Sequence, residues 1–172
     1  MNSSIVPTTP RRSPRELHCP STLWNRLLAL LRLRGHQGRR ESGAFLLGTR
    51  DEAGARITEF VLYDDLDPHS LDTGIVRFDG RYYGALWERC RHNGTSVVAD
   101  VHTHPFGSVQ SPSDRAHPMI SKAGHVALIL PYFAMREISI TDIGIYHYLG
   151  AKCWCTLPVG EREAFLQLKA GS

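Results

Sequence analysis

Two histidines and an aspartate in the segment VADVHTHPFGSVQSPSD (98–114) have the types and spacing of metal ligands. On a β-strand, His102 and His104 point to the same face, with Cα atoms about 6.5–7 Å apart. Both imidazoles can then reach one ion at about 2.0–2.1 Å, and Asp114 on the following loop completes three protein ligands. Three ligands and an open fourth position are typical of catalytic zinc, although other divalent ions also accept these donors. A polar turn after a buried strand is the alternative.

Metal-assisted hydrolysis also needs a group that carries a proton from the attacking water to the leaving group. Glu41 is the candidate, because it immediately precedes the apolar segment SGAFLLGT, which is typical of a core strand. The alternative for a single glutamate in this position is an ordinary solvated loop residue.

These separate pieces together resemble the motifs of the JAMM (JAB1/MPN/Mov34) zinc metalloprotease family. The resemblance covers most of residues 41–149, and two separate motifs in the expected order make it specific. The matching positions are E-x-G-x-x-L-x-G (Glu41, Gly43, Leu46, Gly48), then H-T-H-P (102–105), then S-x-x-D (Ser111, Asp114).

The resemblance implies a role for each matching residue. Glu41 would be the general acid and base, and His102, His104 and Asp114 would bind Zn²⁺. Ser111 would stabilise the oxyanion. The loop between the second histidine and this serine is one residue shorter here than in the family pattern, which leaves Ser113 as an alternative to Ser111.

Members of this family that keep the motif mostly cleave after the C-terminal glycine of ubiquitin or a ubiquitin-like modifier. The resemblance therefore implies a zinc-dependent isopeptidase or peptidase, acting in deconjugation or in precursor processing. The short chain is similar to compact prokaryotic, deubiquitinase-like members, which occur beside activating-enzyme-like and conjugating-enzyme-like proteins, some in antiviral operons. The expected partner is a ubiquitin-like protein or its conjugates, with those enzyme-like proteins as further partners. The alternatives are a hydrolase of a sulfur-carrier protein or small-molecule amide, and a non-catalytic MPN scaffold.

Apolar periodicity and turn signals predict an α/β (α+β) fold, with one MPN/JAB-like domain built on a curved mixed β-sheet flanked by helices. Strands are expected at 42–49, 55–63, 96–105 and 125–133, with two or three more between 137 and 159. Helices are expected from Ser21 or Thr22 to about Arg34, over 79–94, from Asp114 to Ile120, and over 160–171. The segment 64–78 is expected to be a loop with a short strand at its end.

Residues 1–20 are rich in proline, serine, threonine and arginine, which predicts a flexible basic arm ahead of a domain at 21–172. Residues 1–40 carry eight arginines against one acidic residue. A general preference for arginine over lysine explains much of this charge, so nucleic-acid binding is disfavoured but stays an alternative. The remaining chain has twelve basic and sixteen acidic residues, and with the run Asp64, Asp65 and Asp67 this predicts a surface that favours a basic partner.

Four cysteines form no CxxC pair, which argues against a disulfide framework. Cys153 and Cys155 are expected to be free buried thiols on a strand, as in a reducing compartment. The first twenty residues lack the apolar core of a signal peptide. The best apolar run, 23–33, is interrupted by two arginines and is too short to span a bilayer. The sequence therefore predicts a cytoplasmic protein with no membrane partner.

Overall fold

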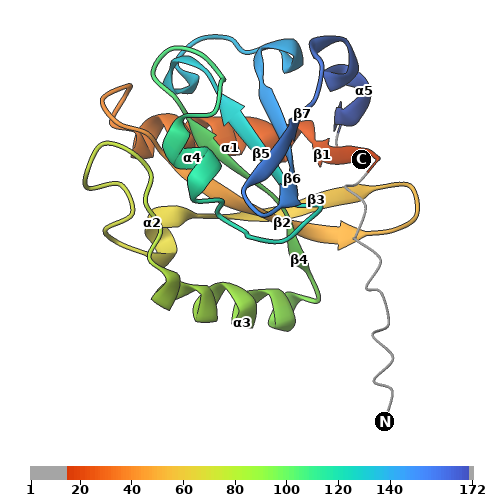
Figure 1. Ribbon diagram of the computed structural model, residues 1–172, viewed down its shortest axis with the longest axis horizontal. Helices are drawn as coiled ribbons and strands as arrows, with labels where there is room; N and C mark the ends of the chain where they lie inside the picture. Colours follow the sequence, from red (N-terminus) through yellow and green to blue (C-terminus); the bar gives the residue numbers. More distant parts are fainter. Residues whose placement is uncertain (1–14, 171–172) are drawn as a thin grey trace.

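Eight strands form one mixed β-sheet in the computed structural model, which describes residues 15–170 (Figure 1). Their order across the sheet is β7-β6-β5-β4-β2-β3-β1-β8. The pairs β4–β5, β1–β3 and β1–β8 are parallel and the other neighbours are antiparallel. The strands are β1 (Leu17–Pro20), β2 (Gly43–Arg50), β3 (Ala55–Leu62), β4 (Ser96–Thr103), β5 (Val126–Leu130), β6 (Gly144–Gly150), β7 (Cys153–Thr156) and β8 (Leu166–Lys169).

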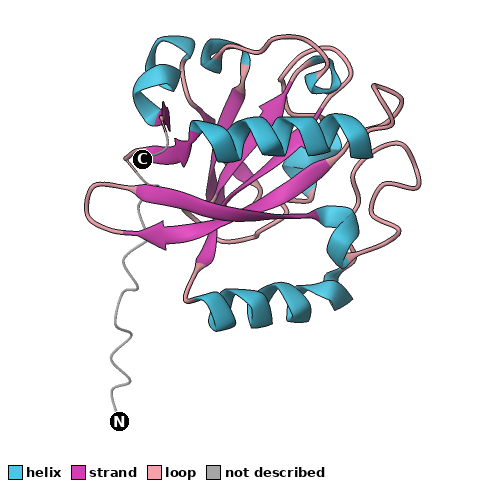
Figure 2. Cartoon of the chain, turned by 180° about the vertical axis from the view of Figure 1, so that it is seen from behind, coloured by secondary structure: helices cyan, strands magenta, loops and turns pink. Residues whose placement is uncertain are grey.

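Helices connect these strands and pack against the sheet (Figure 2). The α-helices are α1 (Ser21–Arg34), α2 (Tyr63–Leu66), α3 (Tyr83–Asn93), α4 (Pro112–Ala116) and α5 (Arg162–Phe165). Four short 3₁₀ helices are η1 (Gly80–Tyr82), η2 (Tyr132–Ala134), η3 (Ile140–Asp142) and η4 (Val159–Glu161). The predicted mixed α+β fold, a sheet flanked by helices in one domain, is confirmed.

Apolar residues on β2 alternate between two cores, one on each face of the sheet. Leu46 packs in the larger core with Leu27 and Leu31 of α1. Phe45 packs in the smaller core with Leu86 of α3. Because successive side chains of a strand point to opposite faces, β2 is buried on both sides and forms the centre of the domain.

The two ends of the domain differ from the sequence-based expectation. The predicted boundary at residue 20 is wrong, because Leu17–Pro20 is strand β1, with Leu17 and Cys19 buried in the larger core. The predicted C-terminal helix is also largely wrong: α5 lasts four residues and the chain continues as β8, parallel to β1. Residues 1–14 of the predicted arm lie outside the described residues.

Loops and caps show further differences from the prediction. The segment 64–78 contains the end of α2 and turns, and no strand forms at its end. The helix predicted from Asp114 begins two residues earlier, at Pro112, and ends at Ala116. The predicted helix at 79–94 is confirmed as η1 followed by α3, and ends at Gly94 in the left-handed conformation that glycine adopts without strain. Within residues 15–170, no helix has the length and apolar character needed to cross a bilayer.

Candidate metal centre

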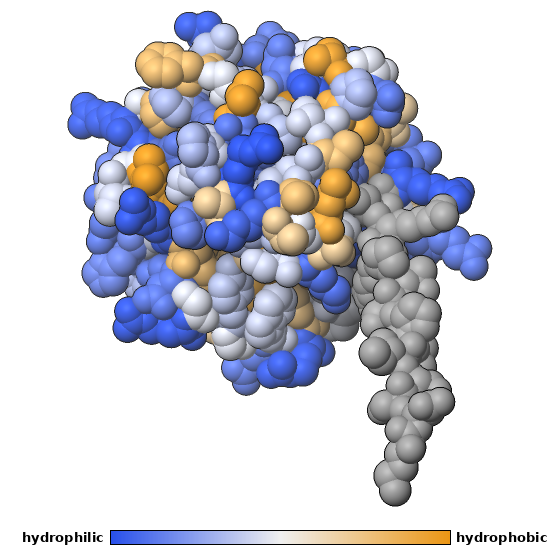
Figure 3. Space-filling view, viewed as in Figure 1, coloured by the Kyte–Doolittle hydropathy of each residue, from blue (hydrophilic) through white to orange (hydrophobic). Residues whose placement is uncertain are grey.

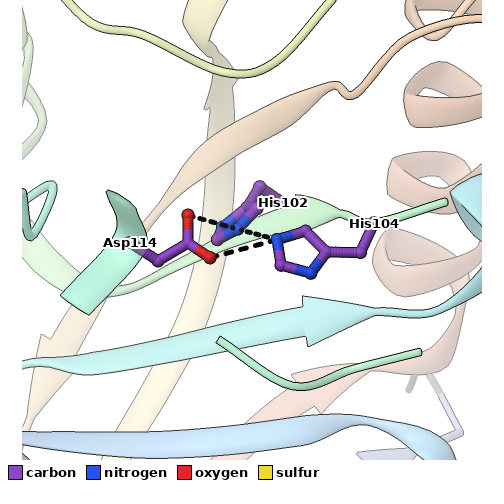
Figure 4. A group of neighbouring side chains, drawn as sticks. All are labelled: His102, His104 and Asp114. Atoms are coloured by element: carbon purple, nitrogen blue, oxygen red, sulfur yellow. Dashed lines mark hydrogen bonds and ion pairs between the residues drawn. The ribbon is translucent and has the colours of Figure 1, made fainter. Parts of the chain in front are cut away.

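His102, His104 and Asp114 point toward one another at the end of β4 (Figure 4). The two histidine Nε2 atoms lie 3.0 Å apart. Asp114 faces both rings, with Oδ1 3.4 Å from Nε2 of His102 and Oδ2 3.1 Å from Nε2 of His104. Both histidines are buried and Asp114 is half-buried. The structure therefore brings together the three ligands that the sequence predicted.

The donor atoms fit a tetrahedral divalent ion. Donors at about 2.0–2.1 Å from such an ion lie about 3.3 Å from one another. The nearest atoms of the three residues are 3.0–3.4 Å apart, although the two histidines face different oxygens of Asp114. Two imidazole nitrogens and a carboxylate are also donors that zinc accepts readily. Among residues 15–170, no other group of three or more histidine, cysteine and acidic side chains has its ligand atoms mutually within 4.8 Å. His102, His104 and Asp114 could therefore hold a metal ion, either zinc or another divalent ion.

Antiparallel pairing of β2 with β4 places Glu41 beside the cluster. Gly43 lies opposite His102 in this ladder, so Glu41, two residues earlier, lies next to His104. Its Oε1 is 3.9 Å from Nε2 of His104, and its Oε2 accepts a hydrogen bond from the backbone N–H of Val76. Glu41 is thus oriented toward the cluster by a loop from another part of the chain.

At two positions in the segment after Glu41, only glycine fits for steric reasons. A Cβ on Gly43 would lie 2.3 Å from the ring of Tyr63, so no larger residue fits without movement of the ring. A Cβ on Gly48 would lie 1.8 Å from the carbonyl oxygen of Arg56, where β2 and β3 shift register. Gly43 thus lets β2 pack closely against Tyr63 and β4, and Gly48 lets it approach β3.

A capping box at the start of α4 orients Asp114. The hydroxyl oxygen of Ser111 accepts a hydrogen bond from the backbone N–H of Asp114, and Oδ2 of Asp114 accepts one of 2.6 Å from the N–H of Ser111. The same carboxylate then faces the histidines. Ser111 therefore helps to position a ligand, and its hydroxyl proton is not used in the cap. Ser113, exposed on α4, lines the neighbouring cleft.

His102 and Asp114 shift each other's pKa. Burial disfavours the charged form of His102, but the hydrogen bond and negative charge of Asp114 outweigh this and raise the pKa of His102. Burial would also raise the pKa of Asp114, yet hydrogen bonds from the two histidines hold it well below its usual range. Without a metal, the carboxylate of Asp114 therefore favours the protonated form of His102.

An unusual backbone turn supports His104. Tyr132, Phe133 and Ala134 all have φ between 52° and 57°, a left-handed conformation that costs about 1–2 kcal/mol for each residue with a side chain. His104 donates its N–H to the carbonyl of Leu130 and accepts at its carbonyl from the N–H of Phe133. The end of β5 and the strained turn after it thus hold the backbone of a ligand on its two sides. Backbone strain of this kind is common at functional sites.

A cleft of about 350 Å³ opens beside Asp114. Its walls combine apolar and aromatic side chains with polar and charged ones, among them Arg77 and Asp114. The lining residues include Val76, Phe78, Tyr83, Met119, Ser113 and His117. Around it, the face drawn in Figure 3 is mostly hydrophilic, with its apolar side chains in small separate groups.

Asp100 was not identified from the sequence, although it lies two residues before His102 on the same face of β4. Its Oδ1 lies 2.5 Å from Nε2 of His125, and its Oδ2 accepts a 3.0 Å hydrogen bond from the hydroxyl of Tyr63. Burial, and then the charge of Asp100, raise the pKa of Tyr63 and keep it a donor. The signal available was a charged residue inside the apolar run VVADV.

The prediction that Cys153 and Cys155 are buried is wrong. Cys153 and Cys155 are exposed on the edge strand β7, and the buried free thiols are Cys19 and Cys90. Burial raises the pKa of the Cys19 thiol to about 12, which makes it inert.

The run of aspartates does not form a free acidic surface either. Asp64 and Asp65 both bind Arg34, at 2.7 and 2.9 Å. Asp67 is buried and accepts hydrogen bonds from the backbone N–H groups of His69 and Asp79. Their charge is used within the domain rather than presented to a partner.

No family model matches this chain. Its fold is similar to the solution structure of protein DSY2949 from Desulfitobacterium hafniense, a structural-genomics target, with a TM-score of 0.59. The two chains are 16% identical, and the similarity covers 90% of this chain and 94% of the other. At this identity the likeness concerns the fold alone.

Proposed function

We propose that this protein is a zinc-dependent hydrolase of amide bonds. The observation that carries the proposal is the placement of Glu41 next to three converging ligands, one of which, Asp114, lines a cleft. A zinc ion held by the three ligands would polarise a carbonyl and lower the pKa of a coordinated water to about 7. The motif resemblance to JAMM metalloproteases gives the reaction class, which the geometry of Glu41 supports.

Glu41 is the proton carrier in this proposal. Its Oε2 is held by the N–H of Val76, which leaves Oε1 directed toward the cluster. There it can take a proton from the attacking water and return it to the leaving amine. Ser111 has a hydroxyl proton to donate to the oxyanion that develops on the substrate carbonyl.

The proposed substrate is a ubiquitin-like protein joined through its C-terminal glycine to a lysine or a peptide. An extended tail can approach the cluster along the cleft beside Asp114, while the folded part of the modifier contacts a second surface. The acidic-surface argument for that second contact does not stand, because Asp64, Asp65 and Asp67 are engaged within the domain. Contacts with the modifier are therefore expected to come from polar groups and small apolar patches around the cleft.

The test compares two substrates with the same leaving group: an intact ubiquitin-like fusion and a peptide of its last six residues. We expect zinc-dependent cleavage of the fusion, a kcat/KM for the peptide at least about tenfold lower, and no cleavage by Glu41→Gln or after chelation. Equal kcat/KM values would favour a hydrolase of small amides or sulfur-carrier tails. A chain that binds zinc but cleaves neither substrate would favour a non-catalytic scaffold.

A further inference from the structure

The second ring nitrogen of His102 is buried without a protein partner. Nε2 of His102 faces His104 and Asp114, so Nδ1 is the nitrogen on the other side of the ring. Nδ1 is inaccessible and has no hydrogen-bond partner among the described residues. A neutral imidazole that uses Nε2 as a ligand carries its proton on Nδ1, so this atom is a buried donor in need of an acceptor.

Gln110 supplies an acceptor that is likewise buried without a hydrogen-bond partner among the described residues. Its side chain is 7% exposed, and the acceptor is its Oε1. Gln110 and His102 line the same small cavity, whose volume is about 20 Å³. That volume has room for about one water molecule, which could link the two atoms.

Other polar groups around this cavity are already engaged. Asp100 directs one oxygen to His125 and the other to the hydroxyl of Tyr63. Asp114 faces the two imidazoles and the start of α4. Trp154 donates its Nε1–H to the carbonyl of Arg115, and His117 is exposed. Gln110 Oε1 is therefore the buried acceptor without a partner that can serve Nδ1 of His102.

The backbone of Gln110 is held so that its side chain stays at the cavity. Its N–H donates to the hydroxyl of Tyr146, which in turn donates to the carbonyl of Ser108 at 2.7 Å. The next residue, Ser111, is the N-cap of α4. The loop between the histidines and Asp114 is thus tied to β6 on one side and to α4 on the other.

We propose that Gln110 is a positioning residue for the metal centre. Its Oε1 accepts the Nδ1–H of His102, through one water in the shared cavity, and fixes the tautomer that leaves Nε2 free to bind the ion. The inference rests on the metal centre proposed above and names a residue outside the matched motif. Partners of this kind orient ligand histidines, and their loss commonly weakens metal binding by about 10–100-fold.

The experiment uses the full chain with Gln110→Leu, which removes the acceptor at similar size, and Gln110→Glu, which restores one. Gln167→Leu on β8, whose amide binds the carbonyl of Ala164, is the matched control. Affinity for Co²⁺ and Zn²⁺ is measured by chelator competition. ¹⁵N NMR reports the tautomer of His102, with the half-buried His147, whose Nδ1 is likewise buried without a hydrogen-bond partner among the described residues, as the internal reference.

We expect Gln110→Leu to weaken metal binding by about 10–100-fold and to change the His102 tautomer, while His147 is unaffected. Gln110→Glu should restore both, and Gln167→Leu should change neither. An unchanged affinity and tautomer in Gln110→Leu would overturn the role of Gln110 and leave the metal centre standing. If the wild-type chain binds no metal, the proposed function fails, and the tautomer in the metal-free chain still decides the role of Gln110.

Discussion

Two clusters of histidine and carboxylate lie side by side along β4, and they differ in whether they are complete. In the cluster of Asp100, His125 and Tyr63, both carboxylate oxygens have a partner, and the side chains are almost wholly buried. In the cluster of His102 and His104 with Asp114, three potential ligands face one another, and Asp114 also lines a cleft. A closed network stabilises a fold, whereas an open one of the same groups is suited to bind an ion.

The largest effect should follow removal of two ligands. His102→Ala with His104→Ala should weaken zinc binding by about 10⁴–10⁶-fold. The four ligands of a structural zinc site together contribute about 10–16 kcal/mol, and this variant loses two of its three protein ligands. Metal analysis and chelator competition measure this, with His69→Ala plus His92→Ala at the surface as the control. Stoichiometric zinc in the double variant would show that the open cluster is not the metal site.

Glu41→Gln should keep zinc and reduce hydrolysis by about 10²–10⁴-fold, because an amide cannot carry the proton. The measurement is kcat on the modifier fusion at equal zinc occupancy. Glu59→Gln, a change in a surface cluster with Arg89 and Asn93, should leave kcat unchanged. Full activity of Glu41→Gln would remove the proposed proton carrier.

Loss of the two aspartates should lower the stability of the metal-free chain by different amounts. Asp100→Ala leaves two buried partners unsatisfied and should lower the free energy of unfolding by about 3–5 kcal/mol. Asp114→Ala loses the capping box, at about 1 kcal/mol, and the pairing of a half-buried carboxylate with the histidines, so it should cost less stability than Asp100→Ala but abolish tight metal binding. Urea unfolding with a chelator present measures both. Equal losses of stability would contradict the distinction between a structural network at Asp100 and a metal-binding cluster at Asp114.

Ser111→Ala should lower kcat by about 10²–10³-fold if this hydroxyl is the oxyanion donor. Because Ser111 also caps α4, zinc content must be measured in the same sample. Ser113→Ala should be close to wild type. The reverse result would assign the oxyanion role to Ser113 and correct the alignment of the shortened loop.

Both the metal affinity of the cluster of His102, His104 and Asp114 and its contribution to stability should depend on pH. The raised pKa of His102 means that metal must displace a proton near and above pH 6.5, so affinity should rise by up to about tenfold per pH unit through that window. In the metal-free chain, the stability due to His102 is present below about pH 6.5 and lost as pH rises through its folded pKa. The stability due to Asp114, whose pKa is lowered, is present above about pH 4 and lost in acid. Asp114→Asn should flatten both profiles, measured by metal titration and by urea unfolding.

Local patterns accounted for the central elements of the fold. The hairpin β2–β3, helices α1 and α3 and strand β4 follow from periodicity and glycine or proline signals within each segment. Strands β1 and β8 could not be predicted in this way. Each has four residues, and they are stable because they pair with each other at the edge of the sheet, through contacts almost 150 residues apart in the chain.

The sequence by itself determined which residues could bind a metal, because the period of a strand puts His102 and His104 on one face and the S-x-x-D cap directs Asp114 back toward its own N-terminus. Only the tertiary structure placed Glu41 at 3.9 Å from His104, since that distance depends on how β2 and β4 pair in the core. The same is true of the cavity that Gln110 shares with His102. Strand and cap geometry act over a few residues and can be read from sequence, whereas register and shared cavities depend on how distant side chains pack.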